Sequence, residues 1–169
     1  MLHRSSCFAG FAGRVTALAL IAIATLTEQA VSVSPPFAPL IGSWSGNGQL
    51  RLDDGRSEQI KCRAYYTERE SGLRLALRCA SGGSKIDLRA QLNADGTRIN
   101  GTWEERQFNA AGSIAGTSTG NRLMLSMDGG GLKAVVAVTT SGATQTVTIT
   151  TDAATLRSAQ IGLLRDSTP

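Results

Sequence analysis

Histidine is almost absent from this chain of 169 residues, and the only one is His3. His3 lies in an N-terminal segment, residues 1–30, that we expect to be removed, so the mature domain is predicted to contain no histidine. This absence excludes Ser-His-Asp and Cys-His catalysis and any zinc or haem site with a histidine ligand. We therefore predict no catalytic residues, no metal site and no cofactor.

The sequence also lacks an apolar run long enough to cross a membrane as a helix. Its main apolar run, Val15–Leu26, is too short to do so and follows Arg4 and Arg14. A short apolar run behind a basic start is typical of a secretory signal peptide. We predict a signal peptide over residues 1–30, cut between Ala24 and Pro36, and a periplasmic or secreted mature chain without a transmembrane span. An uncleaved amphipathic anchor is the alternative.

Cysteine is scarce, with three residues in the whole chain. Cys7 belongs to the predicted signal peptide, so Cys62 and Cys79 remain as an even pair in an exported protein. Such a pair is expected to form a disulfide, which would contribute about 2–3 kcal/mol by restricting the unfolded chain. The alternative is two reduced cysteines in the core. The sequence contains no Cys-x-x-Cys redox motif.

No long stretch after Leu40 has the period of a helix. Short segments of alternating apolar residues are instead separated by turns rich in Gly, Asp and Asn. We predict a single all-β domain over residues 40–166, an antiparallel meander barrel of about 8–10 strands, preceded by a Pro-rich extended lead-in at residues 31–39. A β-sandwich and an open half-barrel are the alternatives, and Leu156–Arg165 is read as the closing strand, with a short terminal helix as its alternative.

The stretch Ile60–Ala80 predicts a hairpin that folds about Glu70–Ser71. This register sets Cys62 opposite Cys79 and Arg63 opposite Arg78. One face then carries the apolar side chains, which are Ile60, Cys62, Ala64, Tyr66, Leu73, Leu75, Leu77 and Cys79. For the preceding strand we expect Leu50 beside Ile60, Gly48 beside Cys62 and Gly46 beside Ala64. The glycines would leave room for a disulfide or for close backbone approach.

The segment Gly42-Ser43-Trp44 resembles the G-x-W opening of the calycins, the superfamily of lipocalins and avidins. That resemblance implies a barrel in which Trp44 seals one end and a basic residue near the last strand, here Arg165, packs over it. The fuller pattern of GSWSGNG, IKCRAYY, LRLALRCAS and INGTWEE is similar to small exported all-β proteins of alphaproteobacteria. This second resemblance implies no particular activity.

Two groups of residues are candidates for binding. Trp44, Trp103 and Tyr66 are predicted on the inner face, where the tryptophans would line or cap a cavity. Arg63 and Arg78 are predicted on the outer face, where they would hold a phosphate or carboxylate of an envelope lipid. Alternatively, Asp87 beside Arg78 on the next strand simply neutralises these arginines.

The charge of the predicted mature part is mildly basic, with 15 Lys and Arg against 12 Asp and Glu from Val31 onwards. No basic run carries interleaved aromatics, so we predict no nucleic-acid partner. Glu104 and Glu105 are adjacent and should point to opposite faces of a strand, so they cannot form an acid/base pair.

From these observations we predict a binding module for a small apolar or amphiphilic ligand and not an enzyme. The alternative is an envelope structural or protein-interaction factor, including one of protease-inhibitor type, with a filled core and a protein partner.

Overall fold

The computed structural model describes residues 36–70, 72–152 and 155–167, and these residues form ten strands and one short 3₁₀ helix. The predicted signal peptide and its cleavage site lie outside the described residues. The helix, η1, spans Ala38–Leu40. The strands are β1 Gly42–Leu52, β2 Ser57–Arg69, β3 Gly72–Ala80, β4 Lys85–Asp95, β5 Arg98–Glu105, β6 Ala110–Thr119, β7 Arg122–Gly129, β8 Leu132–Ser141, β9 Thr144–Thr151 and β10 Leu156–Arg165.

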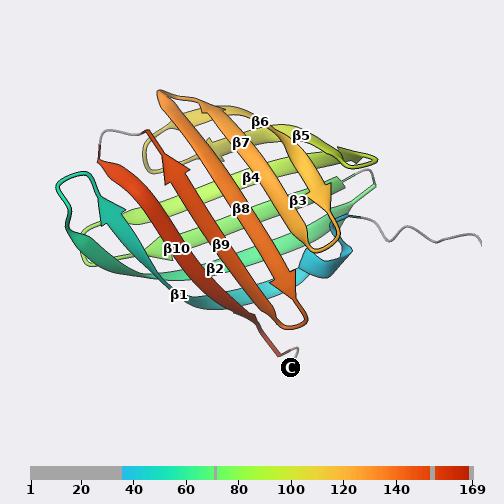
Figure 1. The fold of residues 1–169 in the computed structure, drawn as a ribbon, viewed down its shortest axis with the longest axis horizontal. Helices are drawn as coiled ribbons and strands as arrows, with labels where there is room; N and C mark the ends of the chain where they lie inside the picture. The colour runs from blue at the N-terminus through green and yellow to red at the C-terminus, as the bar shows by residue number, and fades with distance from the viewer. Residues whose placement is uncertain (1–35, 71, 153–154, 168–169) are drawn as a thin grey trace, which may run out of the picture. The chain divides into compact units, whose positions relative to one another are not determined.

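The strands close into an antiparallel barrel in which each strand pairs with its neighbours in the sequence, and β1 pairs with β10 (Figure 1). The predicted meander barrel is therefore confirmed, and the sandwich and half-barrel are not found. Leu156–Arg165 is the closing strand, so the helical alternative for this segment is wrong. Closure requires glycine at one point of β1, because a Cβ at Gly46 would collide with the carbonyl group of Gly162 on β10.

The central hairpin has the predicted register. Cys62 pairs with Cys79 across β2 and β3, and Arg63 pairs with Arg78. The two cysteines form a disulfide, as the sequence predicts. On β2 the residues of the predicted inner face are buried from Ile60 to Tyr66, whereas the residues between them are exposed. The alternation of apolar residues and the placement of the two cysteines opposite each other independently predicted this register, and both predictions are confirmed.

The predicted register of β1 against β2 is wrong by two residues. Gly48 pairs with Ile60 and Gly46 pairs with Cys62, rather than Gly48 with Cys62. The reason is the position of the turn: Leu52 N donates to Arg56 O at 2.9 Å, so the three-residue loop is 53–55 and not 54–56. Asp54 stabilises this turn by accepting from Arg56 N at 2.9 Å and from Arg56 Nε at 2.6 Å. A shift of two residues keeps every side chain on its predicted face.

The lead-in is not extended throughout, which corrects the prediction for residues 31–39. Ala38–Leu40 form η1, whose backbone is closed by a hydrogen bond from Leu40 N to Phe37 O of 2.9 Å. Pro39 is compatible with this turn because its ring fixes φ near the helical value. Phe37 and Leu40 are both buried in the core cluster, and apolar burial therefore outweighs the extended preference of a Pro-rich segment.

The two ends of the barrel differ. The plug end is the end where β1 begins and where η1 packs; the mouth end carries the turns that follow β1, β3, β5, β7 and β9. Figure 1 shows η1 at the right-hand end and the turn from β1 to β2 at the left-hand end. The plug end is thus covered by η1, and the mouth end is bordered, within the described part of the chain, by turns between strands.

Candidate functional site

Trp44 lies at the plug end and is fully buried, with an exposed fraction of 0%. Its indole Nε1 donates to Leu40 O at 2.7 Å, which ties η1 to β1. The Arg165 guanidinium lies 4.2 Å from the centroid of the indole ring, and Arg165 Nη2 donates to Pro39 O at 2.6 Å. This is the arrangement that the resemblance to calycins implies for Trp44 and Arg165. Trp44 therefore holds the plug in place and offers no free surface.

Tyr66 is also buried near the plug end. Its hydroxyl donates to Gln145 Oε1 at 2.9 Å, and Gln145 Nε2 donates to Thr140 Oγ1 at 3.4 Å. Burial raises the pKa of the Tyr66 phenol far above its usual value, so the group stays protonated and remains a donor. The sequence analysis missed Gln145, although its inward position in the alternating strand β9 could have pointed to it.

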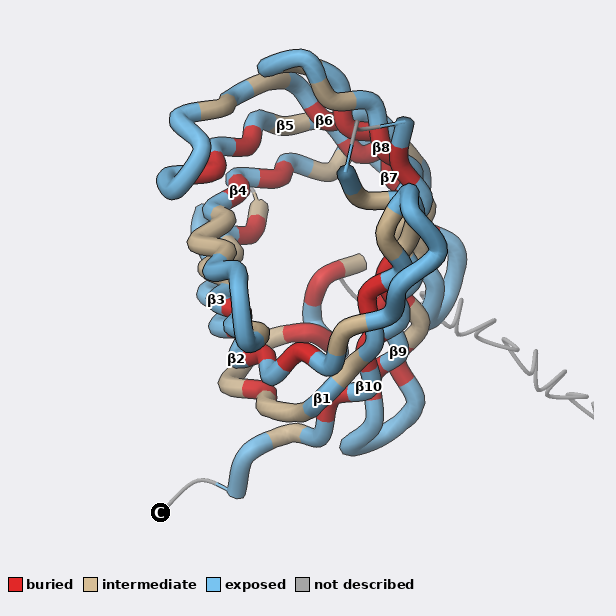
Figure 2. Tube along the Cα trace, turned by 90° about the vertical axis from the view of Figure 1, so that its left-hand side faces the viewer, coloured by how far each residue is buried: buried red, intermediate tan, exposed pale blue. Residues whose placement is uncertain are grey.

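The inner face in the mouth half of the barrel is only partly packed: Ile60 and Leu50 are buried there, whereas other inward residues are accessible. Leu73, Leu75 and Leu77 follow one another on the same face of β3, yet Leu73 is 1% exposed whereas Leu75 and Leu77 are only partly buried. Figure 2 views the barrel from the mouth end, and intermediate burial is visible along β3. Other inward apolar residues with the same intermediate burial include Ile86, Leu88, Leu132, Ile149 and Leu156. These partly buried residues give a part of the mouth half an apolar inner surface that is accessible to solvent.

Trp103 lies on the inner face of β5 between two small residues, Ala90 on β4 and Gly112 on β6. It is 3% exposed, and its Nε1 has no hydrogen-bond partner among the described residues. The two tryptophans therefore differ, because the N–H of Trp44 is satisfied by the plug and that of Trp103 is not. A buried donor without an acceptor costs about 1–3 kcal/mol, which an acceptor on a bound molecule would recover.

Two carboxylates face inward at the mouth end. Glu105 is 8% exposed and accepts hydrogen bonds from Asp87 N and Phe108 N, both at 2.7 Å. Glu58 accepts from Ser81 Oγ at 2.9 Å. Glu104 is exposed, so the predicted opposite orientation of Glu104 and Glu105 is confirmed. The inward position of Glu105 follows from its alternation with Trp103, but the sequence analysis did not assign it a place at the mouth.

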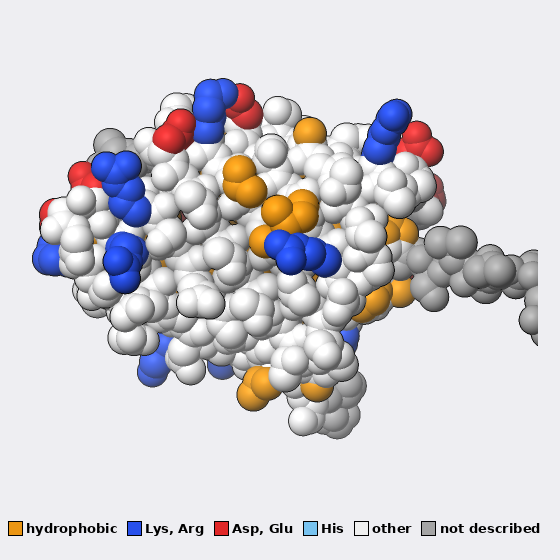
Figure 3. Space-filling model, in the orientation of Figure 1, with side chains coloured by type: hydrophobic (Ala, Val, Ile, Leu, Met, Phe, Trp, Pro, Cys, Tyr) orange, Lys and Arg blue, Asp and Glu red, His pale blue; other side chains and the backbone are white. Residues whose placement is uncertain are grey.

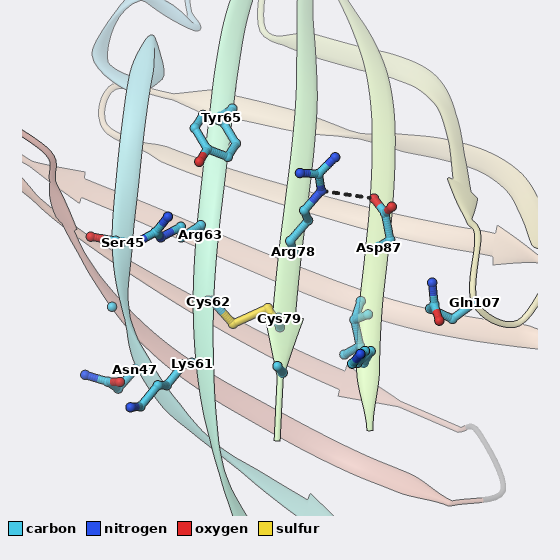
Figure 4. A pocket seen from close by; sticks show the side chains of 14 residues that line it. Ser45, Asn47, Lys61, Cys62, Arg63, Tyr65, Arg78, Cys79, Asp87 and Gln107 are labelled. Carbon is cyan, nitrogen blue, oxygen red and sulfur yellow. Dashed lines mark ion pairs between the residues drawn. A yellow bond between two sulfur atoms is a disulfide. The ribbon is translucent and has the colours of Figure 1, made fainter. Parts of the chain in front are cut away.

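Arg63 and Arg78 lie on the outer face, in an open groove of about 730 Å³ across β1–β4 (Figure 4). The polar side chains that border it include Lys61, Arg63, Tyr65, Arg78, Lys85 and Asp87. Asp87 lies next to Arg78 in the predicted register, with Oδ1 at 3.8 Å from Arg78 Nε. The same carboxylate lies 4.0 Å from Arg89 and from Arg106. Asp87 is thus shared among three arginines, and no described carboxylate forms an ion pair with Arg63.

The structure therefore separates the candidate residues into two places. Trp44, Tyr66 and Trp103 belong to the barrel interior, and Arg63 and Arg78 belong to the outer groove. Within the described ranges, no three or more His, Cys, Asp or Glu side chains are placed to hold a metal ion. The same residues include no helix with the length and apolar character needed to span a bilayer.

The sequence matches no protein-family model and no curated protein. Similar folds occur among solved structures. The protein Rv2717c of M. tuberculosis is 14% identical and has a TM-score of 0.63, over 79% of this chain and 99% of that one. The S-type phycobiliprotein lyase CPES of Guillardia theta is 14% identical and has a TM-score of 0.57, over 79% of this chain and 92% of that one. These likenesses show a common barrel fold.

The likeness to a lyase overturns the prediction that the chain is not an enzyme. That prediction depended on the lack of histidine, of a free thiol and of an inward carboxylate pair in the mature part. A barrel of the same architecture belongs to a protein named as a lyase, so these absences do not exclude enzymatic activity on this fold.

Proposed function

We propose that the barrel binds a small apolar or amphiphilic molecule in its interior and that this molecule enters through the mouth end. The observation that carries the proposal is the incomplete burial of Leu75 and Leu77 in the middle of β3. Leu73 and Cys79, which flank them on the same face, are both buried. In a filled barrel, residues in the middle of a strand would be as buried as those near its end. Apolar surface that stays accessible inside a barrel is suited to an apolar ligand.

Trp103 gives the proposed site its polar contact. Its N–H is buried on the inner face and is unpaired among the described residues. A carbonyl or ether oxygen of the ligand would accept from it. Glu58 and Glu105 face inward at the mouth, and they disfavour an anionic group inside the barrel because like charges repel. The ligand is therefore expected to carry an acceptor oxygen and no negative charge.

We also propose that the protein works in the periplasm or outside the cell. The Cys62–Cys79 disulfide supports this location, because disulfides persist in oxidising compartments. The predicted signal peptide points to the same place.

Leu77→Phe tests whether the interior is open. The larger side chain should enter accessible space, so the free energy of unfolding should change by less than about 1 kcal/mol. Because the added ring occupies the proposed site, affinity for the apolar fluorescent probe phenylnaphthylamine should fall by about tenfold, or 1.4 kcal/mol. Denaturant titration and fluorescence titration measure the two effects.

Leu73→Phe is the matched control, on the same face of the same strand but in the packed half. Overpacking there should cost about 1–3 kcal/mol of stability and leave the affinity of the folded protein unchanged. If both variants lose stability equally and neither alters probe binding, the interior is filled. The protein-interaction alternative would then replace this proposal.

Trp103→Phe tests the hydrogen bond. The wild-type protein should bind a long-chain ketone about fivefold more tightly than the hydrocarbon of equal length, which corresponds to about 1 kcal/mol for one hydrogen bond. The variant keeps an aromatic ring and loses the donor, so this preference should disappear. Displacement of phenylnaphthylamine measures it. Trp44→Phe removes an N–H that is already bonded to Leu40 and should keep the preference; equal loss in both variants would contradict the role of Trp103.

A further inference from the structure

We propose that the outer face of β2–β4 docks the protein on an anionic lipid bilayer. The outward residues of these three strands include seven exposed cations, which we call the basic face: Lys61, Arg63, Arg69, Arg74, Arg78, Lys85 and Arg89. Asp87 and Asp95, both on β4, are the carboxylates among the described outward residues of the same strands. The outer groove lies in the part of this face nearer the mouth end.

The charge of the protein is concentrated on this face. The remaining described residues carry eight Lys and Arg against ten Asp and Glu, so their net charge is negative. Figure 3 shows the face that bears β7–β9, where uncharged side chains cover most of the surface. A modest net charge for the whole chain therefore hides a strongly polarised barrel, which orients toward an anionic surface.

The protein itself neutralises little of this charge. The atoms of Asp87 lie 3.8–4.0 Å from the nearest nitrogens of Arg78, Arg89 and Arg106, which is too long for hydrogen bonds. Arg63 lies directly opposite Arg78, and like charges in that position repel. An external phosphate at this pair would relieve the repulsion and would gain charge-assisted hydrogen bonds.

Exposed aromatic side chains favour a lipid bilayer over a soluble polyanion. Tyr65 is 39% exposed within the basic face, and Phe108 is 69% exposed in the turn between β5 and β6 at the mouth end. Gln107, the neighbour of Phe108, borders the outer groove. Aromatic and basic side chains together are suited to the interfacial layer of a bilayer, where rings enter the boundary and cations meet phosphate.

This inference does not depend on the proposed interior site. The basic face points away from the barrel interior, and its residues are separate from Trp103 and Leu77. Loss of bilayer binding would leave the binding of phenylnaphthylamine intact, so failure of one proposal can be told from failure of the other.

The test is co-sedimentation with vesicles of phosphatidylcholine that contain phosphatidylglycerol, compared with vesicles of phosphatidylcholine alone. Protein is purified from the cells that produce it, and N-terminal sequencing verifies that all variants carry the same processed form. The wild type should bind only the anionic vesicles, and added salt should release it. Because one basic side chain near an anionic surface contributes about a fivefold gain in partitioning, Arg63→Gln with Arg78→Gln should weaken binding by about 25-fold.

The control is Arg98→Gln with Arg157→Gln, which removes the same charge from exposed positions off the basic face. This variant should bind nearly as well as the wild type. An equal loss of vesicle binding in both double variants would mean that binding depends only on the net charge of the protein, and it would overturn the proposal. Equally strong binding to neutral and to anionic vesicles would also overturn the proposal. So would release of the protein from anionic vesicles by soluble double-stranded DNA when inorganic phosphate of equal total charge does not release it.

Discussion

Trp44→Ala is expected to lower the free energy of unfolding by about 3–5 kcal/mol, the cost of truncating a large buried aromatic residue. Trp44 is fully buried, its N–H is bonded to Leu40 O, and the Arg165 guanidinium covers its ring. The substitution would remove all three contacts and leave a cavity beneath η1. Since small domains are stable by only about 5–15 kcal/mol, the loss should be evident in equilibrium denaturation followed by circular dichroism.

Phe108→Ala is the control for Trp44→Ala. Phe108 is 69% exposed, so its truncation should change the free energy of unfolding by no more than about 0.5 kcal/mol. Similar losses for the two variants would mean that the plug end does not hold the barrel together in the way described. A further readout is proteolysis, because release of η1 should make the segment before β1 more susceptible to cleavage in Trp44→Ala alone.

Loss of the Cys62–Cys79 disulfide is expected to cost about 3 kcal/mol. The two cysteines are 17 residues apart, and opening a loop of this size returns conformational entropy to the unfolded chain. The measurement is guanidinium denaturation of the wild type with and without a reductant that acts on the unfolded protein. Reduction should lower the guanidinium concentration at the midpoint of unfolding. It should also change the dependence of the unfolding free energy on guanidinium, because the reduced unfolded chain is less compact.

The double variant Cys62→Ala with Cys79→Ala is the control for that experiment. It should have about the stability of the reduced wild type and should be unaffected by reductant. A reductant effect of the same size in the double variant would show that the reductant acts elsewhere. An unchanged midpoint for the reduced wild type would contradict a stabilising role for the disulfide.

The features that were predicted correctly depend on short-range patterns. The hairpin of β2 and β3 is specified by alternation and by a pair of cysteines within one stretch, and Cys62 pairs with Cys79 as expected. The turn between β1 and β2 was less well predicted, because three-residue loops at 53–55 and at 54–56 both contain the turn signal Asp54-Gly55. The hydrogen bonds of Asp54 to Arg56 decide between them, and neither bond has a counterpart in the apolar pattern.

The candidate site shows the same division. Sequence alternation placed Trp103 and Leu77 on the inner face and Arg63 and Arg78 on the outer face, and the strand pairing agrees. It could not say that Leu77 stays accessible while Leu73 is packed, since both belong to one apolar series. Nor could it say that absent histidine leaves enzymatic activity open, because that correction came from the likeness of the whole fold to a lyase.

The sequence by itself determined which side chains face inward, because side chains alternate along a strand whatever the strand packs against. It also determined the disulfide and the meander order. Only the tertiary structure decided that η1 plugs one end, that β1 meets β10 instead of leaving a half-barrel, and that part of the inner face in the mouth half remains accessible. These features depend on barrel width and on contacts between residues far apart in the chain, such as Trp44 with Arg165, and no local pattern encodes such distances.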